Sequence, residues 1–443
     1  MDPLSRRTFT VAAAGTLAAA AAAAAAGTAQ AAASAAPATA DPARPAPAAP
    51  TAPPPRGAGA TGPHHPPTAR RELRGMWIAT VANTDWPSAP GLSPREQRAE
   101  LTDLLDLAVE RRLNAVMFQV RPTADAFWPS PYEPWSQYLT GTQGRDPGWD
   151  PLGTAVREAH RRGLELHAWF NPYRVAMTDD PGTLAPTHPA RLHPEWVLPY
   201  GGKLYYDPGQ PQVRRFVEDA MLDAVRRYPI DAVHFDDYFY PYPVAGQTFA
   251  DDASYARHGA GFPDRDAWRR HNTDLLVAET AARIRRVRPG TQYGISPFGV
   301  WRNAATDPLG SATQAGVQTY DDLHADTRGW VRRGLLDYIA PQVYWNIGFA
   351  AADYAVLVPW WSDVVAGTRA KLYVGEALYK AGAAGQPAQW QDPAELSRHL
   401  TFDADHPQVR GNIYFSATQV AADPLGAMSE VVAEHYPTRV RTP

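Results

Sequence analysis

The sequence predicts an α/β fold, a (β/α)8 barrel of the TIM type, from two observations. From residue 71 onward, short apolar runs alternate with amphipathic segments through eight β/α units, which is the repeat of such a barrel. The competing fold, a doubly wound open sheet, would want a glycine-rich phosphate turn after its first strand. The residues that follow the first strand, Val81–Pro87, contain no glycine, and this favours the closed barrel.

Eight short apolar runs are interpreted as the strands of this barrel. They are Leu73–Thr80, Asn114–Arg121, Glu165–Asn171, Ala232–Asp236, Tyr293–Phe298, Tyr338–Trp345, Leu372–Leu378 and Gly411–Ser416.

Amphipathic segments between these runs predict the helices. The clearest begins at Ser93, which is a helix cap, with Pro94 in the first helical position and Glu96 completing a capping box. The other predicted helices are Asp150–Arg162, Gln212–Tyr228, Ala267–Arg288 and Asp321–Arg333. Several of them are followed closely by glycine, which is a common helix stop.

The first residues predict an export signal. Arg6 and Arg7 precede a weakly apolar run, Val11–Ala26, and an A-x-A cleavage pattern follows it. The run is shorter than the ~20 residues that a membrane span needs. The pattern resembles a twin-arginine signal over residues 1–31, so the mature protein is expected outside the cell or in the cell envelope.

Composition sets the remaining boundaries. Residues 32–70 are mostly Ala, Pro, Thr and Gly and predict a disordered linker, which leaves the barrel over residues 71–435. The chain of 443 residues contains no cysteine, which excludes disulfides, thiolate metal sites and a cysteine nucleophile. Its net charge of -4 gives no basic surface for nucleic acid.

The most informative stretch is IDAVHFDDYFYPY, at Ile230–Tyr242. A short apolar strand ends there in two carboxylates, Asp236 and Asp237, and four aromatic rings follow within five residues. Buried acids are costly unless they are paired or used. Aromatic faces are the usual apolar partners of the C–H surface of a sugar ring. The stretch therefore predicts a site at which sugars are cut.

Alternation along the strands predicts which side chains point into the barrel mouth. Chemistry in this fold lies at the C-terminal ends of the strands, and residues two apart share a face. If Phe235 packs outward on the helices, His234 and Asp236 point inward. The same reasoning on other strands places these residues inward: Gln119, Arg121, His167, Trp169, Asn171, Gln342 and Tyr344.

Glycoside cleavage needs a proton donor and a partner that stabilises or attacks the anomeric carbon. Neighbours in an extended chain point in opposite directions, so Asp236 and Asp237 are not expected to fill both roles. Glu376, in the seventh strand, is the first candidate for the second carboxyl, but alternation does not settle whether it faces inward. Alternatively, an N-acetyl group of the substrate acts as the nucleophile and Asp236 or Asp237 orients it.

The same residues also allow purely structural interpretations. Asp237 could cap a turn, and Asp236 could form an ion pair with Arg121. His167 and His234 could be hydrogen-bonded histidines of the barrel core.

Seven motifs resemble glycosyl hydrolase-like family 10: MWIAT, FQVRPTADAFWPS, HAWFNPYR, LYYDPGQPQVR, HFDDYFYP, GISPFGVWRN and APQVYWN. The resemblance covers roughly Glu72–Tyr414 and keeps the motif order. It implies an exported barrel related to glycoside hydrolases that acts on bacterial glycans such as peptidoglycan. By position it carries site roles onto Arg121, Asn171, Tyr173, Arg174, Asp236, Asp237, Gln342, Tyr344 and Trp345. The family pattern favours an uncharged polar residue in the seventh strand, so Glu376 is a departure that weakens its claim.

The predicted site has no cofactor and no metal ligand. Its candidate catalytic residues are Asp236, Asp237 and Glu376. Its candidate substrate-binding residues are Arg121, His167, Asn171, Tyr173, Arg174, His234, Tyr238, Tyr240, Gln342, Tyr344 and Trp345. Arg121 or Arg174 could contact a carboxylate on the glycan, such as the lactyl group of muramic acid.

The function predicted first is an exported glycoside hydrolase that cleaves a bacterial glycan by acid/base catalysis. The first alternative is a carbohydrate-binding barrel without catalysis, which would use the same aromatic and polar groups. The second is a metal-dependent amidohydrolase or deacetylase. That class needs a His-x-His pair early in the barrel, and the first strand, LRGMWIAT, contains no histidine.

Overall fold

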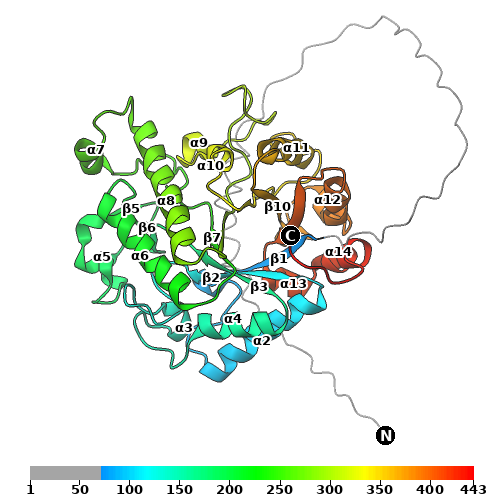
Figure 1. Cartoon of the computed structure of the whole chain (residues 1–443), viewed down its shortest axis with the longest axis horizontal. Helices are drawn as coiled ribbons and strands as arrows, with labels where there is room; N and C mark the ends of the chain where they lie inside the picture. The colour runs from blue at the N-terminus through cyan, green and yellow to red at the C-terminus, as the bar shows by residue number, and fades with distance from the viewer. Residues whose placement is uncertain (1–70) are drawn as a thin grey trace, which may run out of the picture. The chain divides into compact units, whose positions relative to one another are not determined.

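The computed structural model describes residues 71–443, so the predicted signal, 1–31, and linker, 32–70, lie outside the described residues. The described part of the chain forms a barrel of strands surrounded by helices (Figure 1). Helices outside a parallel barrel are the arrangement that the alternation of apolar and amphipathic segments predicts.

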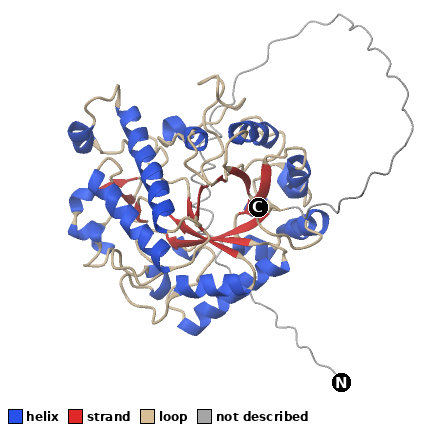
Figure 2. Ribbon diagram, viewed as in Figure 1, coloured by secondary structure: helices blue, strands red, loops and turns tan. Residues whose placement is uncertain are grey.

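Eight parallel strands close the barrel within residues 71–443, and they are drawn in red in Figure 2. In order around the barrel they are β1 (Leu73–Ile78), β11 (Val409–Tyr414), β10 (Lys371–Glu376), β9 (Tyr338–Ile339), β8 (Gln292–Ile295), β7 (Ala232–Phe235), β3 (Glu165–Phe170) and β2 (Ala115–Arg121). The predicted fold and all eight predicted strands are confirmed. Several strands stop earlier than predicted, and β9 does so because Pro341 has no N–H to donate to the sheet.

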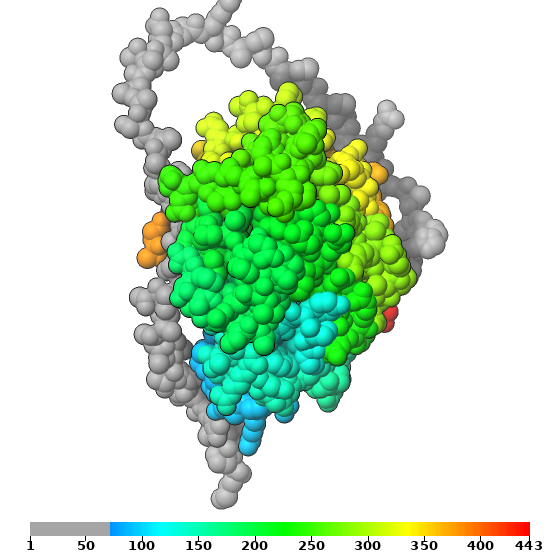
Figure 3. All heavy atoms as spheres, turned by 90° about the vertical axis from the view of Figure 1, so that its left-hand side faces the viewer, coloured from blue at the N-terminus to red at the C-terminus, as the bar shows by residue number. Residues whose placement is uncertain are grey.

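Helices cover the outside of the barrel. Those of six residues or more are α2 (Pro94–Glu110), α4 (Pro151–Arg161), α6 (Pro211–Arg227), α7 (Asp252–His258), α8 (Arg265–Val287), α10 (Thr327–Arg332), α11 (Tyr354–Val365), α12 (Glu395–Asp403), α13 (Ala417–Ala422) and α14 (Ala427–His435). The shorter ones include α3 (Gln137–Thr140), α5 (Pro189–Leu192), α9 (Thr319–Asp322) and the 3-10 turn η4 (Leu378–Lys380). Seen from the side of α5, α6 and α8, these green segments make up most of the surface (Figure 3).

Local sequence signals explain where the helices begin and end. The predicted capping box is present, because the Ser93 backbone N–H donates to Glu96 over 2.8 Å and the Ser93 hydroxyl accepts from the Glu96 N–H. The segment predicted as one helix, Asp321–Arg333, is instead two helices, α9 and α10. His324, between them, has a φ of 49°, a left-handed conformation that no helix continues through.

The sequence did not predict the small sheet beside the barrel, nor the helices α7 and α11 to α14. Between β3 and α6 the chain makes a small antiparallel sheet, here called the side sheet, of β4 (Arg174–Ala176), β6 (Lys203–Tyr206) and β5 (Val197–Tyr200). Gly201 and Gly202, both with positive φ, turn the chain between β5 and β6. The strands have only three or four residues each, so their periodicity is too short to read from the sequence.

Side chains alternate between the barrel interior and the layer of helices, and β10 illustrates the rule. Tyr373 lies in the interior with Trp77 and Tyr338. Val374, the next residue, packs outward against Leu357 of α11. Glu376, two residues after Val374, therefore belongs to the outward-facing set.

Candidate active site

The C-terminal end of β7 brings two carboxylates to the barrel mouth. Val233 and Phe235 pack outward in the main core, so His234 faces the interior, as the alternation predicts. The strand ends at Phe235 and the chain bends at Asp237. The chain is no longer extended there, so the two carboxylates point to the same side. Both of their charges raise the pKa values of Tyr238 and Tyr242. The two acids, called the mouth pair below, lie in one cluster.

Asp236 is held by a set of hydrogen-bond donors. Trp169 Nε1 donates to it over 3.1 Å, Asn171 Nδ2 over 3.0 Å and the Tyr238 backbone N–H over 3.2 Å. Burial raises the pKa of Asp236, while the positive charge of Arg174 and these donors act in the opposite direction. The donors favour an ionised carboxylate at this position.

Asp237 has a different environment. Its carboxylate accepts from the hydroxyl of Tyr242 and interacts with Gln342. Burial, followed by repulsion from Asp236, raises the pKa of Asp237 to about 6. Asp236 is surrounded by donors and the charge of Arg174, whereas Asp237 is repelled by Asp236. Two neighbouring acids in such different surroundings can serve as one anion and one proton donor.

Partly exposed aromatic rings surround the mouth pair. We call them the aromatic rim: Tyr238, Tyr242, Phe298, Tyr344, Trp345, Tyr379 and Phe415. Successive ring centroids are 5.5 Å apart for Tyr238 and Tyr242, and 5.3 Å apart for Phe298 and Trp345. The rings come from the segments that follow five neighbouring strands, β7 to β11, so they line one side of the barrel mouth.

Sequence reasoning missed three of these rings, Phe298, Tyr379 and Phe415. Each follows the C-terminal end of a barrel strand within a few residues. That position was the available signal, since it is the one that singled out the rings after β7.

Three predicted binding residues are enclosed and do not reach the mouth. Arg121 is fully buried and forms an ion pair with Glu133, with Nε and Oε2 2.7 Å apart. This pairing also replaces the ion pair with Asp236 considered above. Tyr173 is fully buried in the outer core, and Tyr240 packs against Phe249.

The two predicted histidines lie inside the barrel, below the mouth. His167 Nδ1 and His234 Nδ1 are 3.0 and 2.8 Å from the hydroxyl of Tyr338, and both histidines are fully buried. Burial holds the pKa of His234 well below its usual range. These contacts match the interpretation as hydrogen-bonded core histidines.

Glu376 lies on the other side of the barrel wall from the mouth pair. Its carboxylate accepts from Tyr354 and Asn412, each over 2.9 Å, and is 2.9 Å from His399 Nδ1. With Asp403, which also bonds Tyr354 and Asn412, these residues form an outer-layer cluster between the strands and the helices α11 and α12. The candidate second carboxyl therefore does not reach the mouth, because Glu376 lies on the face of β10 that points toward the helices.

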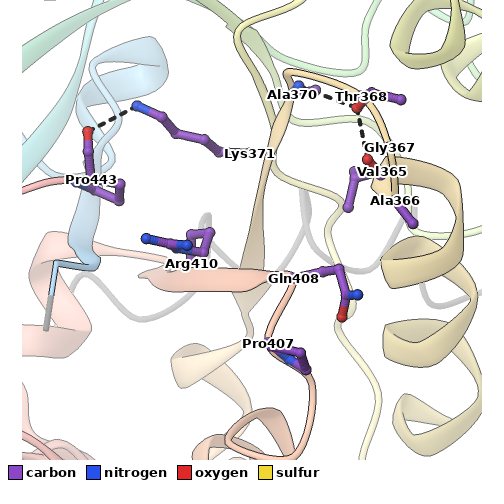
Figure 4. A pocket seen from close by; sticks show the side chains of 10 residues that line it. All are labelled: Val365, Ala366, Gly367, Thr368, Ala370, Lys371, Pro407, Gln408, Arg410 and Pro443. Atoms are coloured by element: carbon purple, nitrogen blue, oxygen red, sulfur yellow. Dashed lines mark hydrogen bonds between the residues drawn. The ribbon is translucent and has the colours of Figure 1, made fainter.

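A surface pocket at the opposite end of the barrel has a different character (Figure 4). It lies where β10 and β11 begin, and its lining includes Lys371 and Arg410. Lys371 Nζ donates to the Pro443 carbonyl over 3.0 Å. The ten lining residues include no acidic or aromatic side chain, so it lacks the groups that distinguish the mouth.

The described residues offer no metal-ligand grouping. Within 71–443, no three side chains of His, Cys, Asp or Glu are arranged to hold an ion. No helix in the same range combines the length and the apolar character needed to cross a bilayer.

A closed β/α barrel with two acids and an aromatic rim at its C-terminal mouth is the architecture of a glycosidase-like barrel. The chain belongs to the glycosyl hydrolase-like 10 family, whose model matches residues 72–392, which confirms the resemblance.

Two bacterial relatives support this membership. The chain is 51% identical over 368 residues to glycosyl hydrolase YngK of Bacillus subtilis, covering 83% of this chain and 72% of that protein. It is 41% identical over 378 residues to glycosyl hydrolase DigH of Escherichia coli K12, covering 81% and 86%. Among solved structures, the glycoside hydrolase domain of PgaB (BpsB) from Bordetella bronchiseptica aligns with a TM-score of 0.51 at 13% identity, over 81% of this chain and 97% of that one. At that identity the last likeness concerns the fold.

Proposed function

We propose that the protein is an exported glycoside hydrolase that cleaves a bacterial glycan, with the glycan chain of peptidoglycan as its substrate. The observation that carries the proposal is the mouth pair, Asp236 and Asp237, which ends a barrel strand inside an aromatic rim. Family membership and the names of the two relatives support a glycosidase role. The predicted twin-arginine signal is the basis for proposing export.

Asp237 is the proposed proton donor. With a pKa of about 6, about half of the carboxyl is protonated at pH 6 and about a tenth at pH 7. In the first step this proton passes to the glycosidic oxygen while the bond from that oxygen to the anomeric carbon breaks.

The proposed nucleophile is the N-acetyl group of the sugar itself. Because Glu376 points toward the helices, β10 supplies no second catalytic carboxyl. The substrate-assisted alternative is therefore preferred. The acetamido oxygen attacks the anomeric carbon, and ionised Asp236 accepts the acetamido N–H and stabilises its positive charge. Water then opens the cyclic intermediate after giving a proton to Asp237, which restores the acid.

The aromatic rim and the polar groups would hold the sugar. Tyr344 and Trp345 follow β9 and are partly exposed, so their rings are available to stack on sugar C–H faces. Gln342 interacts with Asp237 and donates to the Ser296 carbonyl over 2.9 Å, a position from which its amide can also meet a sugar hydroxyl.

The test uses Asp236→Asn and Asp237→Asn in an assay for soluble fragments released from peptide-stripped wall glycan. Each variant is expected to lose about 10³-fold in kcat, the range for removing a general acid or base. Asp403→Asn is the control, because Asp403 is a buried acid outside the mouth. Full activity in both mouth variants would refute the proposal. Binding to the glycan without new reducing ends in the wild type would favour the non-catalytic alternative.

A further inference from the structure

The side sheet presents two cationic side chains on one face. In an antiparallel sheet, directly opposite residues share a face, as do residues two apart on one strand. Arg174 of β4 lies opposite Tyr205 of β6, and Lys203 is two residues before Tyr205. Leu204 and Tyr206, on the other face, pack into the main core. Arg174, Tyr205 and Lys203 therefore form a cationic face that points away from that core.

Arg174 is the exception among the buried arginines of the described chain. Arg74, Arg121 and Arg214 each form an ion pair with a glutamate. Arg174 is only 6% exposed, yet it has no ion pair with any residue in 71–443. Its Nε donates to the Pro122 carbonyl over 3.1 Å, and its two Nη nitrogens have no hydrogen-bond partner in the described chain. The Asp236 carboxylate acts on it only electrostatically, without an ion-pair contact. A buried guanidinium whose Nη groups are unbonded is costly, which points to an anion that comes from outside.

Lys203 adds a second cation of the same kind. Its half-buried side chain makes no hydrogen bond or ion pair within the described range. Burial, followed by repulsion from Arg174, lowers the pKa of Lys203. The two charges therefore repel each other, and an anion between them would relieve the repulsion.

The cationic face adjoins the mouth pair. The Arg174 guanidinium lies 5.0 Å from the centroid of the Tyr238 ring. The Arg174 backbone N–H donates to Asn171 Oδ1 over 2.8 Å, and Asn171 Nδ2 donates to Asp236. A group bound to Arg174 would thus be attached to the sugar at the mouth or to its neighbour.

We propose that Arg174 and Lys203 form a subsite for a carboxylate carried by a sugar of the glycan substrate. A guanidinium binds a carboxylate in a bidentate way, and an ammonium adds a second positive charge. The inference rests on the proposed function, since it assumes that a glycan occupies the mouth. It makes Lys203 a specificity-determining residue that the sequence did not indicate.

Lys203 separates this subsite from a simpler role for Arg174. Arg174 also supports the ionised form of Asp236, so its removal is expected to impair cleavage of any glycan. Lys203 is not among the main causes that shift the pKa of Asp236. Its removal should therefore affect only substrates that carry the carboxylate.

The experiment measures glycan binding and cleavage with two probes. One is peptide-free wall glycan fragments, in which the muramic acid residues carry lactyl carboxylates, and the other is the same fragments after reduction of the carboxyls to alcohols. The wild type is compared with Lys203→Gln, with Arg174→Gln and with Lys371→Gln. The last removes an equal charge at the opposite end of the barrel, where β10 begins.

The wild type is expected to bind the carboxylated fragments about tenfold more tightly than the reduced ones at low salt, with the preference shrinking as salt is added. Lys203→Gln should lose most of that preference, Arg174→Gln should lose it entirely, and Lys371→Gln should keep it. Equal binding of the two probes by the wild type, or an undiminished preference in Lys203→Gln, would overturn the subsite. A preserved binding preference without any cleavage would instead contradict the proposed hydrolase and leave the subsite standing.

Discussion

The mouth pair and the outer-layer cluster are both groups of buried acids near the C-terminal ends of barrel strands, but they face opposite sides of the wall. Asp237 lies among the partly exposed rings of the aromatic rim, whereas Glu376 is fully buried and paired with His399. Burial raises the pKa of Asp237 to about 6 and, followed by the charge of Glu376, that of Asp403 to about 7. Perturbed acids therefore do not by themselves identify the site in this barrel. Strand parity and an aromatic surrounding distinguish the two groups.

The outer-layer cluster is expected to support stability rather than catalysis. Burial acts to lower the pKa of His399, but Glu376 and Glu395 outweigh it and raise that pKa to about 9. Since the folded pKa lies above the unfolded one, this stabilisation is fully present below about pH 6.5 and is lost as pH rises through about 9.

The largest expected difference between the two regions comes from Glu376→Gln. Removing the charge leaves buried His399 with Glu395 as its one remaining anionic partner, which should lower the free energy of unfolding by about 3 kcal/mol at pH 7. The kcat on wall glycan, measured below the melting transition, should stay within about threefold of wild type, because Glu376 does not reach the mouth. Urea unfolding and the fragment-release assay on the same preparation check both parts. A stable variant with a 10³-fold lower kcat would show that Glu376 is catalytic.

Asp237→Asn is expected to have a smaller effect on the free energy of unfolding, and of opposite sign. The raised pKa of Asp237 means that its ionised form destabilises the fold. This cost sets in as pH rises from about 4 to about 6 and is complete above pH 6. The neutral variant should therefore be more stable than wild type by about 2 kcal/mol at pH 7 and equally stable near pH 4, as measured by urea unfolding. The same gain at both pH values would contradict the assigned pKa.

The smallest expected effect concerns the aromatic rim. Trp345→Ala should raise KM for wall glycan roughly tenfold with little change in kcat, because a stacking contact holds substrate and transition state alike. Trp360→Ala is the matched control, since Trp360 is a partly exposed tryptophan of α11 stacked on Trp301. If both variants raised KM equally, the rim would have no special part in binding.

Much of the fold could be predicted because each strand and several of the long helices carry local signals. The box at Ser93 and the apolar runs depend only on neighbouring residues. The side sheet could not be predicted, since β4 has only three residues and its pairing with β6 joins distant segments. β9 was predicted too long because Pro341 interrupts its ladder.

The candidate site was predicted where alternation applied and misjudged where the chain leaves the strand. His234 and Asp236 face inward as expected, but Asp237 joins Asp236 because the strand ends one residue before the pair. Arg121 was expected to be available to substrate, and a long-range partner, Glu133, encloses it instead. To place Glu376, one must know which face of β10 points inward, and the sequence left that open. Such assignments depend on three-dimensional partners that no local pattern specifies.

A crystal structure of Asp237→Asn with an N-acetylated wall-glycan oligomer would measure the central geometry directly. We expect the substituted side chain at position 237 to lie within about 3.2 Å of the glycosidic oxygen and Asp236 to accept the acetamido N–H. A sugar chain that crosses the mouth with both side chains out of reach of the scissile linkage would contradict the account.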